Sequence, residues 1–287
     1  MQNILKNKTI SGWLMVSPLA VVLLLFLVLP IVMIVAVSFW RATEFSIIPD
    51  FDFENYEFLF GSSVTYRVFI NTFKYALITW ALTLLIGFTV AYYLAFHIRT
   101  QTWQIALFLL CTIPFWTSNV IRMIAWIPLL GRNGLVNSGL MKTGLINHPI
   151  EWLLFSEFSV VLALVHLFTF FMVVPIFNSM IRIDKSLIEA AYDAGATGFQ
   201  TLVNVIIPLA KPGIVIGSIF VITIVMGDFI TIGVMGGQQI AAAGKIIETR
   251  VNALQFPAAA ANAVILLVIT FLIITMMSRI VDIKKEL

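Results

Sequence analysis

The stretch from Trp13 to Val37 reads WLMVSPLAVVLLLFLVLPIVMIVAV, and no charged residue interrupts the chain between Thr9 and Trp40. A bilayer core about 30 Å thick is crossed by roughly 20 helical residues. The run is long enough to cross it. It is too long for the apolar part of a cleavable signal peptide, and it lacks the small-residue cleavage pattern of one. It therefore predicts a first transmembrane helix over about 13–37.

Five more apolar stretches of similar length follow, at about 75–96, 104–121, 158–181, 213–235 and 258–278. Lipid cannot satisfy free backbone N–H and C=O groups, so apolar runs of this length predict helices. We expect an all-α, polytopic membrane protein with six transmembrane helices, formed by residues 1–287 as a single domain. Only the fifth predicted span contains an acidic residue, Asp228.

The composition of the whole chain excludes several functional classes. Of its 287 residues, 61% are hydrophobic and only 11% are charged, and the mean hydropathy is +1.04. Soluble domains carry about 25% charged residues, and disordered chains combine low hydrophobicity with high net charge. A formal net charge of +3 is too small, and too widely spread, to indicate nucleic-acid binding. The single cysteine, Cys111, permits no internal disulfide.

Basic residues predict how the spans are oriented. Six spans put both termini on one side, and that side carries Lys6, Lys8, Arg99, Arg182, Lys185, Lys211, Arg279, Lys284 and Lys285. The opposite side carries Arg41, Arg67, Lys74, Arg122, Arg132, Lys142, Lys245 and Arg250. The first set lies on shorter segments, where the positive-inside rule operates. We therefore expect both termini to be cytoplasmic.

The internal segment 182–212 is too polar to cross a membrane. Its part DKSLIEAAYDAG, residues 184–195, predicts a short helix. Ser186 followed by Glu189 matches a capping box, and Gly195 suits the left-handed residue that ends many helices. Taken alone, these residues describe a surface helix-turn-helix on the membrane face.

A second helical stretch is predicted over 199–207. Pro208 and Pro212 follow it and are expected to break the helix just before the fifth span.

The motif within this segment is more specific than its helical pattern. Glu189-Ala190-Ala191, three residues, Gly195, nine residues and then Val205-Ile206-Ile207-Pro208 resemble the EAA loop of ABC importer permeases. That family has Ile, any residue and Leu-Pro at the end of the motif, so Val205 and Ile207 are conservative departures. The resemblance implies a type I ABC importer permease fold in a bacterial inner membrane, with a cytoplasmic EAA coupling helix.

The same resemblance implies roles and partners. In that family the short helix sits in a cleft of a separate ATPase subunit and transmits its closure. The implied ATPase-coupling residues are Glu189, Ala190, Ala191, Gly195 and Pro208. The implied partners are a second homologous permease, two ATP-binding cassette ATPases and an extracytoplasmic solute-binding protein. ATP and Mg would be bound on the ATPases, so no catalytic residue, cofactor or metal is expected on this chain.

Two further blocks of sequence indicate which group of ABC importer permeases the chain resembles. IPFWTSNVIRMIAW at 113–126, followed by NGLVN at 133–137, looks like the polyamine-type permeases, which include the first permease subunit of spermidine/putrescine importers. MGDF at 226–229 with Gly236-Gly237 resembles the same group, although the proline that usually precedes the two glycines is absent. The implied substrate is a polyamine or a related small cation. The same machine carrying an opine, an amino-acid derivative or a phosphonate is the alternative.

Asp228 is the first candidate for substrate contact, because an acidic group inside a span costs about 3 kcal/mol on insertion scales. It is either a ligand for a cation in the pathway or a structural residue at a helix end or beside a partner side chain. Nearby glycines favour a broken helix that lines a cavity.

Trp116, Asn119, Arg122 and Trp126 are three or four residues apart and would share one face of a helix. They form either an aromatic and polar pathway near the external mouth, or an interfacial tryptophan belt with Arg122 reaching outward. Arg122 would repel a cation in the same space. His166, within the fourth span, is expected to pack or hydrogen-bond.

Two other protein classes compete with this interpretation. An ion-coupled secondary transporter or channel would often contain a pair of broken helices, whereas the sequence shows one glycine-interrupted span. A membrane enzyme would need a cluster of nucleophile, base or metal ligands, and no such cluster is visible in the sequence.

Overall fold

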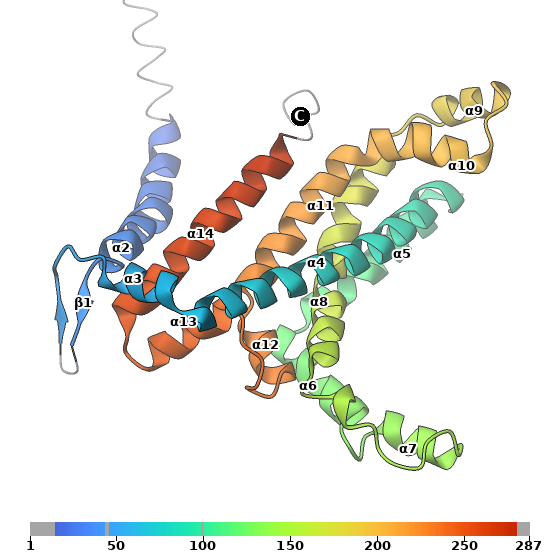
Figure 1. Ribbon diagram of the computed structural model, residues 1–287. Helices are drawn as coiled ribbons and strands as arrows, with labels where there is room; N and C mark the ends of the chain where they lie inside the picture. The colour runs from blue at the N-terminus through green and yellow to red at the C-terminus, as the bar shows by residue number, and fades with distance from the viewer. Residues whose placement is uncertain (1–14, 44–45, 99, 280–287) are drawn as a thin grey trace, which may run out of the picture. The chain divides into compact units, whose positions relative to one another are not determined.

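The computed structural model describes residues 15–43, 46–98 and 100–279, which are almost entirely helical (Figure 1). Among these residues the strands are β1 (Arg41–Ala42) and β2 (Ile47–Ile48), which pair antiparallel with Arg41 opposite Ile48. The chain separates into two compact units, residues 1–63 with 247–265 and residues 64–246 with 266–287.

The first unit contains a helical segment that ends in α2 (Leu29–Val37), followed by the β1–β2 pair and α3 (Glu54–Gly61). It also contains most of α13 (Ala243–Asn252) and the first part of α14 (Phe256–Ser278).

The chain leaves α2 through a tight aromatic and polar turn. The ring of Phe39 stacks on Phe51 with centroids 4.7 Å apart, and the Ser38 and Tyr56 hydroxyls hydrogen-bond at 2.7 Å. Arg41 forms an ion pair with Asp52, and this hydrogen-bonded contact lowers the pKa of the Asp52 carboxyl from its ordinary value. The end of the first span is thus fixed by local contacts within the unit.

The second unit holds the remaining helices. They are α4 (Ser63–Tyr92), α5 (Gln101–Thr112), α6 (Asn119–Leu130), α7 (Leu135–Lys142), α8 (Glu157–Met180), α9 (Lys185–Asp193), α10 (Gly198–Thr201), α11 (Ile207–Gly227) and α12 (Ile230–Met235). Short 3-10 turns lie at Ile113–Trp116 and Glu151–Leu153, and π-helical turns at Tyr93–His97 and Leu202–Ile206.

The core of the second unit is built on the pair α8 and α11. Gly213 and Gly217, four residues apart, face α8, so a methyl group at Gly213 would overlap the Pro175 carbonyl oxygen. A methyl group at Gly217 would lie 2.9 Å from the sulfur of the fully buried Met172. Small residues at this spacing let two membrane helices approach closely. Trp80 of α4 joins the pair, since its indole N–H donates to the Ser218 hydroxyl at 2.8 Å.

Five helical segments are long and apolar enough to cross a membrane: Met15–Val37, Ser63–His97, Glu151–Met180, Gly198–Gly227 and Phe256–Ser278. A sixth candidate is the pair Gln101–Trp116 and Asn119–Lys142, bent by 87° at a short break. The described residues therefore contain five spans, or six if the bent pair is counted as one.

Two of the expected spans are interrupted. The sequence predicts one transmembrane helix over about 104–121, but helical structure stops at Trp116, where the Thr117 hydroxyl donates to the Pro114 carbonyl at 2.8 Å. The 3-10 turn at Ile113–Trp116 contains Pro114, which has no N–H for helical bonding, and Thr117 after it is extended. The stretch 213–235 is also wrong as one helix, because α11 ends at Gly227 and Asp228 has an extended backbone.

The predicted break at Pro208 and Pro212 is wrong. Helical structure runs from Gly198 to Gly227, with Pro208 in the first turn of α11 and Pro212 inside it. Neither proline has an N–H to donate into the helix, yet the helix continues past both. The π-helical turn at Leu202–Ile206 precedes it directly, with the Ile207 N–H bonded to the Leu202 carbonyl.

Candidate functional site

The predicted short helix in the internal segment is α9, but its start differs from the prediction. Asp184 caps it, because the Asp184 carboxylate accepts from the Ser186 backbone N–H at 3.0 Å. The predicted capping box of Ser186 and Glu189 is therefore wrong, since Ser186 already lies inside the helix. Hydrogen bonds from Ser186 lower the pKa of the Asp184 carboxyl, which suits an anion at a helix N-terminus.

The end of α9 is as predicted. Gly195 has a φ of +84°, a left-handed conformation. The Ala196 N–H donates to the Ala191 carbonyl at 3.0 Å and the Gly195 N–H to the Tyr192 carbonyl at 2.9 Å. This pair of bonds is a Schellman motif. A side chain at Gly195 would meet no atom within 4 Å, so in this chain the glycine is needed for its backbone conformation rather than for space.

The segment 184–201, which contains α9, α10 and the turn between them and is called the α9–α10 loop below, exposes apolar as well as charged side chains. Leu187, Tyr192 and Phe199 are 48%, 51% and 75% exposed. Glu189 and Ala190 are exposed too, and Ala191 is half-buried. An exposed apolar patch rimmed by polar groups is typical of a protein interaction site. Pro208 is also exposed, at the start of α11.

A cavity of about 710 Å³ lies beside the base of α9. Its walls come from the end of α8, the start of α9 and the first half of α11, with Asn178, Ser179, Arg182 and Asp184 as the polar lining. No sequence motif predicts this cavity, because its lining residues lie on separate elements.

Asp228 lies beyond the opposite end of α11, about 32 Å along a helix of 21 residues. Its carboxylate accepts from the Thr231 N–H at 2.8 Å and from the Thr231 hydroxyl at 2.6 Å. The side chain therefore caps the start of α12, in the manner of an N-terminal aspartate. The predicted helix break is present at this residue, and the carboxylate is partly buried.

The four predicted pathway residues near α6 do not share one helix. Trp116 ends the 3-10 turn before the 87° bend and is 84% exposed, whereas Asn119 begins α6 after the bend. The expectation of one continuous face is therefore wrong for Trp116. Asn119 and Arg122 do come together, because the Arg122 guanidinium donates to the Asn119 side-chain oxygen.

Trp126, one turn further along α6 than Arg122, contacts α8. Its indole N–H donates to His166 Nδ1 at 3.1 Å, and the two rings meet edge to face. The expected hydrogen-bonding role of His166 is thus present. Among the described residues, the side-chain hydrogen bonds of Asp228 go to Thr231 and the one from Arg122 goes to Asn119, so no hydrogen bond links these two parts of the predicted pathway set.

Further polar contacts, which no sequence motif predicts, involve the start of α8 and the end of α12. Glu157 at the start of α8 receives the Lys74 ammonium at 2.5 Å and the Tyr75 hydroxyl at 3.2 Å. The Ser159 hydroxyl donates to the Met235 carbonyl at 2.9 Å, which fixes the end of α12 against α8. These residues lie far apart in the sequence, and no spacing rule connects them.

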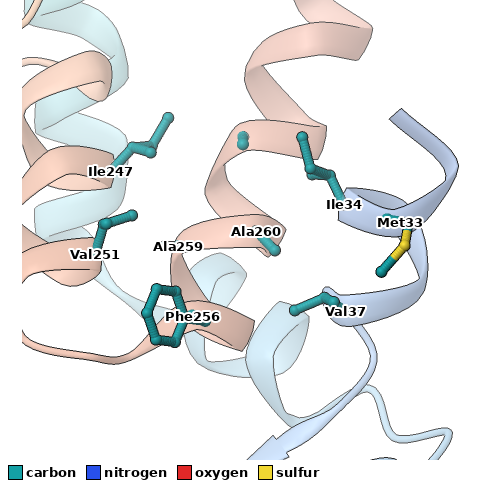
Figure 2. A pocket seen from close by; sticks show the side chains of 9 residues that line it. Met33, Ile34, Val37, Ile247, Val251, Phe256, Ala259 and Ala260 are labelled. Carbon is teal, nitrogen blue, oxygen red and sulfur yellow. The ribbon is translucent and has the colours of Figure 1, made fainter. Parts of the chain in front are cut away.

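The first unit contains a groove of about 270 Å³ with a wholly apolar lining. Figure 2 shows α14 between two sets of side chains, with Ile34 and Val37 of α2 on one side and Ile247 and Val251 of α13 on the other. Such a groove offers no partner to a cation, so it is not a site for a charged solute. Within the described ranges no cluster of three or more His, Cys, Asp or Glu side chains could hold a metal ion.

Solved structures resemble this fold. A bacterial alginate ABC transporter in complex with an alginate-bound periplasmic protein aligns at a TM-score of 0.75, over 97% of this chain and 95% of that one, with 16% identity. The MetNI methionine ABC transporter aligns at 0.53 over 76% of this chain and 97% of that one, with 17% identity. The fold is that of an ABC importer permease.

Curated relatives define the family. The spermidine/putrescine transport system permease protein PotB of Escherichia coli K12 is 33% identical over 284 residues, 97% of this chain and 98% of that protein. PotB of Haemophilus influenzae is 33% identical over 229 residues, 79% of this chain and 78% of that protein. No family model matches the chain. The chain belongs to the PotB family of ABC importer permease subunits.

Proposed function

We propose that this chain forms half of the translocation pathway of an ATP-driven importer for polyamines such as spermidine and putrescine. The observation that carries the substrate class is the near full-length similarity to permeases named for these two compounds. The single acidic side chain at the broken fifth span, Asp228, fits a small organic cation.

The α9–α10 loop is the proposed contact with the ATPase. Its exposed Leu187, Tyr192 and Phe199 supply apolar area, and Glu189 supplies a charged acceptor at the rim. Small residues at Ala190 and Ala191 leave room for close approach. Pro208 starts the helix that follows, so motion of the loop is transmitted directly to α11, whose far end carries the break at Asp228.

The proposed assembly contains a second homologous permease, two ATP-binding cassette subunits that bind ATP and Mg, and an extracytoplasmic solute-binding protein. Both termini and the α9–α10 loop are then cytoplasmic, and Asp228, α12 and α6 belong to the outer half. ATP binding would close the ATPases, move the loops of both permeases together and open the pathway outward. Hydrolysis of ATP would return the transporter to the state it had before ATP bound.

Uptake by the reconstituted complex tests the substrate class. Proteoliposomes containing both permeases and the ATPases, supplied with the binding protein and ATP inside, should accumulate labelled spermidine or putrescine. Anionic compounds such as phosphonates should neither accumulate nor compete. Accumulation of anionic compounds alone would contradict the polyamine assignment and the proposed role of Asp228, and ATP-independent uptake would favour an ion-coupled transporter.

A further inference from the structure

The start of α13 lies on the break in the fifth span. A Cβ atom at Gly244 would be 2.7 Å from the Gly227 carbonyl oxygen, so the two backbones touch where α11 ends. The Lys245 side chain reaches α12, because its ammonium nitrogen would be 3.3 Å from a Cβ atom at Gly233. Residues 241–245, called the strap below, thus contact both helices that flank the break.

A buried hydrogen bond fastens the strap to α4. The Ala243 backbone N–H donates to the Thr72 hydroxyl at 2.8 Å, and this hydroxyl donates in turn to the Val68 carbonyl at 2.8 Å. Thr72 and Ala243 are 1% and 2% exposed, so water cannot replace the bond while the strap is seated. A longer bond lies beside it, from the Asn71 amide to the Ala241 carbonyl at 3.3 Å.

The strap covers the part of the fifth span that the proposed function uses. Asp228 directly follows α11, and its backbone carbonyl oxygen would be 3.2 Å from a Cβ atom at Gly244. A rearrangement that moves the break away from α4 must therefore separate the strap either from the break or from Thr72. A hydrogen bond that exists in only one of two states shifts the equilibrium toward that state.

On the basis of the proposed function, we infer that Thr72 is a positioning residue for transport. Its hydroxyl holds the strap on the break and keeps the outer end of the pathway closed until ATP and the binding protein act. Because Thr72 is buried against the strap, it acts on the closed state and does not contact the solute.

ATP hydrolysis in the absence of the binding protein tests this inference. The full complex is reconstituted with Thr72→Val, which lacks the hydroxyl and leaves the buried Ala243 N–H without its acceptor. Such a loss shifts an equilibrium about fivefold or more, so hydrolysis without the binding protein should rise by about that factor. The amount of solute carried per ATP should fall. A defect in folding or assembly would instead lower both rates.

Two further variants on the same helix serve as controls. Thr72→Ser keeps the hydroxyl and should retain wild-type coupling. Thr83→Val removes a hydroxyl that is equally buried but donates to the Thr79 and Trp80 carbonyls of α4 itself. It should also retain wild-type coupling. An equal change in Thr72→Val and Thr83→Val, or unchanged hydrolysis in Thr72→Val, would overturn the inference.

Labelling of the strap separates this inference from the proposed function. In a Cys111→Ser background, Ala242→Cys places a thiol at a position that is 0% exposed. A membrane-impermeant maleimide should label it about fivefold faster or more when Thr72→Val is added, because the strap leaves its seat more often. Equal labelling rates would overturn the inference. If the wild-type complex hydrolyses no ATP or carries no polyamine, the proposed function fails, whereas the labelling still decides whether Thr72 holds the strap.

Discussion

Gly195 adopts a backbone conformation that side chains with a Cβ atom resist, and it does so at the end of the helix proposed to contact the ATPase. A β-branched residue at positive φ is strained by about 1–3 kcal/mol. We predict that Gly195→Val lowers polyamine uptake about tenfold or more while the protein still inserts. Gly195→Asn should retain much more uptake, because asparagine tolerates this conformation.

Gly144 provides a matched control. It also has positive φ, +73°, and open space around it, but it lies after α7. Gly144→Val introduces the same local strain away from the loop, so uptake and substrate-stimulated ATPase activity should stay near wild type. Equal losses in both valine variants would show that strain in general, and not the shape of α9, affects transport.

Asp228 holds α12 and is also the proposed cation ligand, and two substitutions separate these roles. Thr231→Val removes the hydroxyl bond to the carboxylate but keeps the charge, whereas Asp228→Asn removes the charge and can still accept from the Thr231 N–H. We expect Asp228→Asn to lower labelled spermidine uptake about tenfold without loss of assembly, and Thr231→Val to have a smaller effect. Unchanged uptake by Asp228→Asn would mean that Asp228 caps α12 and is not a ligand for the cation.

Among the helices, the α8–α11 pair depends on two glycines. A methyl group at Gly213 would overlap backbone atoms of Pro175, whereas one at Gly217 meets mainly the flexible Met172 side chain. Gly213→Ala should therefore destabilise the permease by about 1–3 kcal/mol, and Gly217→Ala by less. Thermal unfolding in detergent measures both, with Gly139→Ala in open space on α7 as the control. An unchanged midpoint for Gly213→Ala would mean that the pair is not closely packed.

For the molecule as a whole, the orientation in the membrane is open to a direct measurement. After Cys111→Ser, single cysteines are placed at Phe199 in the α9–α10 loop and at Leu145 after α7, which are 75% and 73% exposed. A membrane-impermeant maleimide should label Leu145→Cys in intact spheroplasts and Phe199→Cys only after the membrane is opened. The reverse pattern would place both termini outside.

The sequence predicts the broad architecture well, because lipid leaves an apolar run few choices other than a helix. Interruptions are harder to predict. The break after Trp116 follows a short 3-10 turn with Pro114 in it, inside an otherwise apolar run. Asp184 caps α9 although Ser186 matches the motif better.

The two parts of the candidate site were not equally predictable. The α9–α10 loop is continuous in sequence, so its motif was visible. The 710 Å³ cavity and the contacts of Glu157 join residues that only the folded chain brings together.

The π-helical turn at Leu202–Ile206 has a consequence for the direction in which the loop points. Each residue of an α-helix advances the chain by about 100° around the axis, so the one extra residue in a π turn offsets everything before it by about that angle. Deleting a single residue there would convert the turn to α-helix and swing α9 and α10 about a quarter turn around the axis of α11. Loop and membrane helix would both stay intact, but the loop would face away from the proposed ATPase contact. We therefore expect this deletion to uncouple transport from ATP hydrolysis through the changed direction of the loop alone.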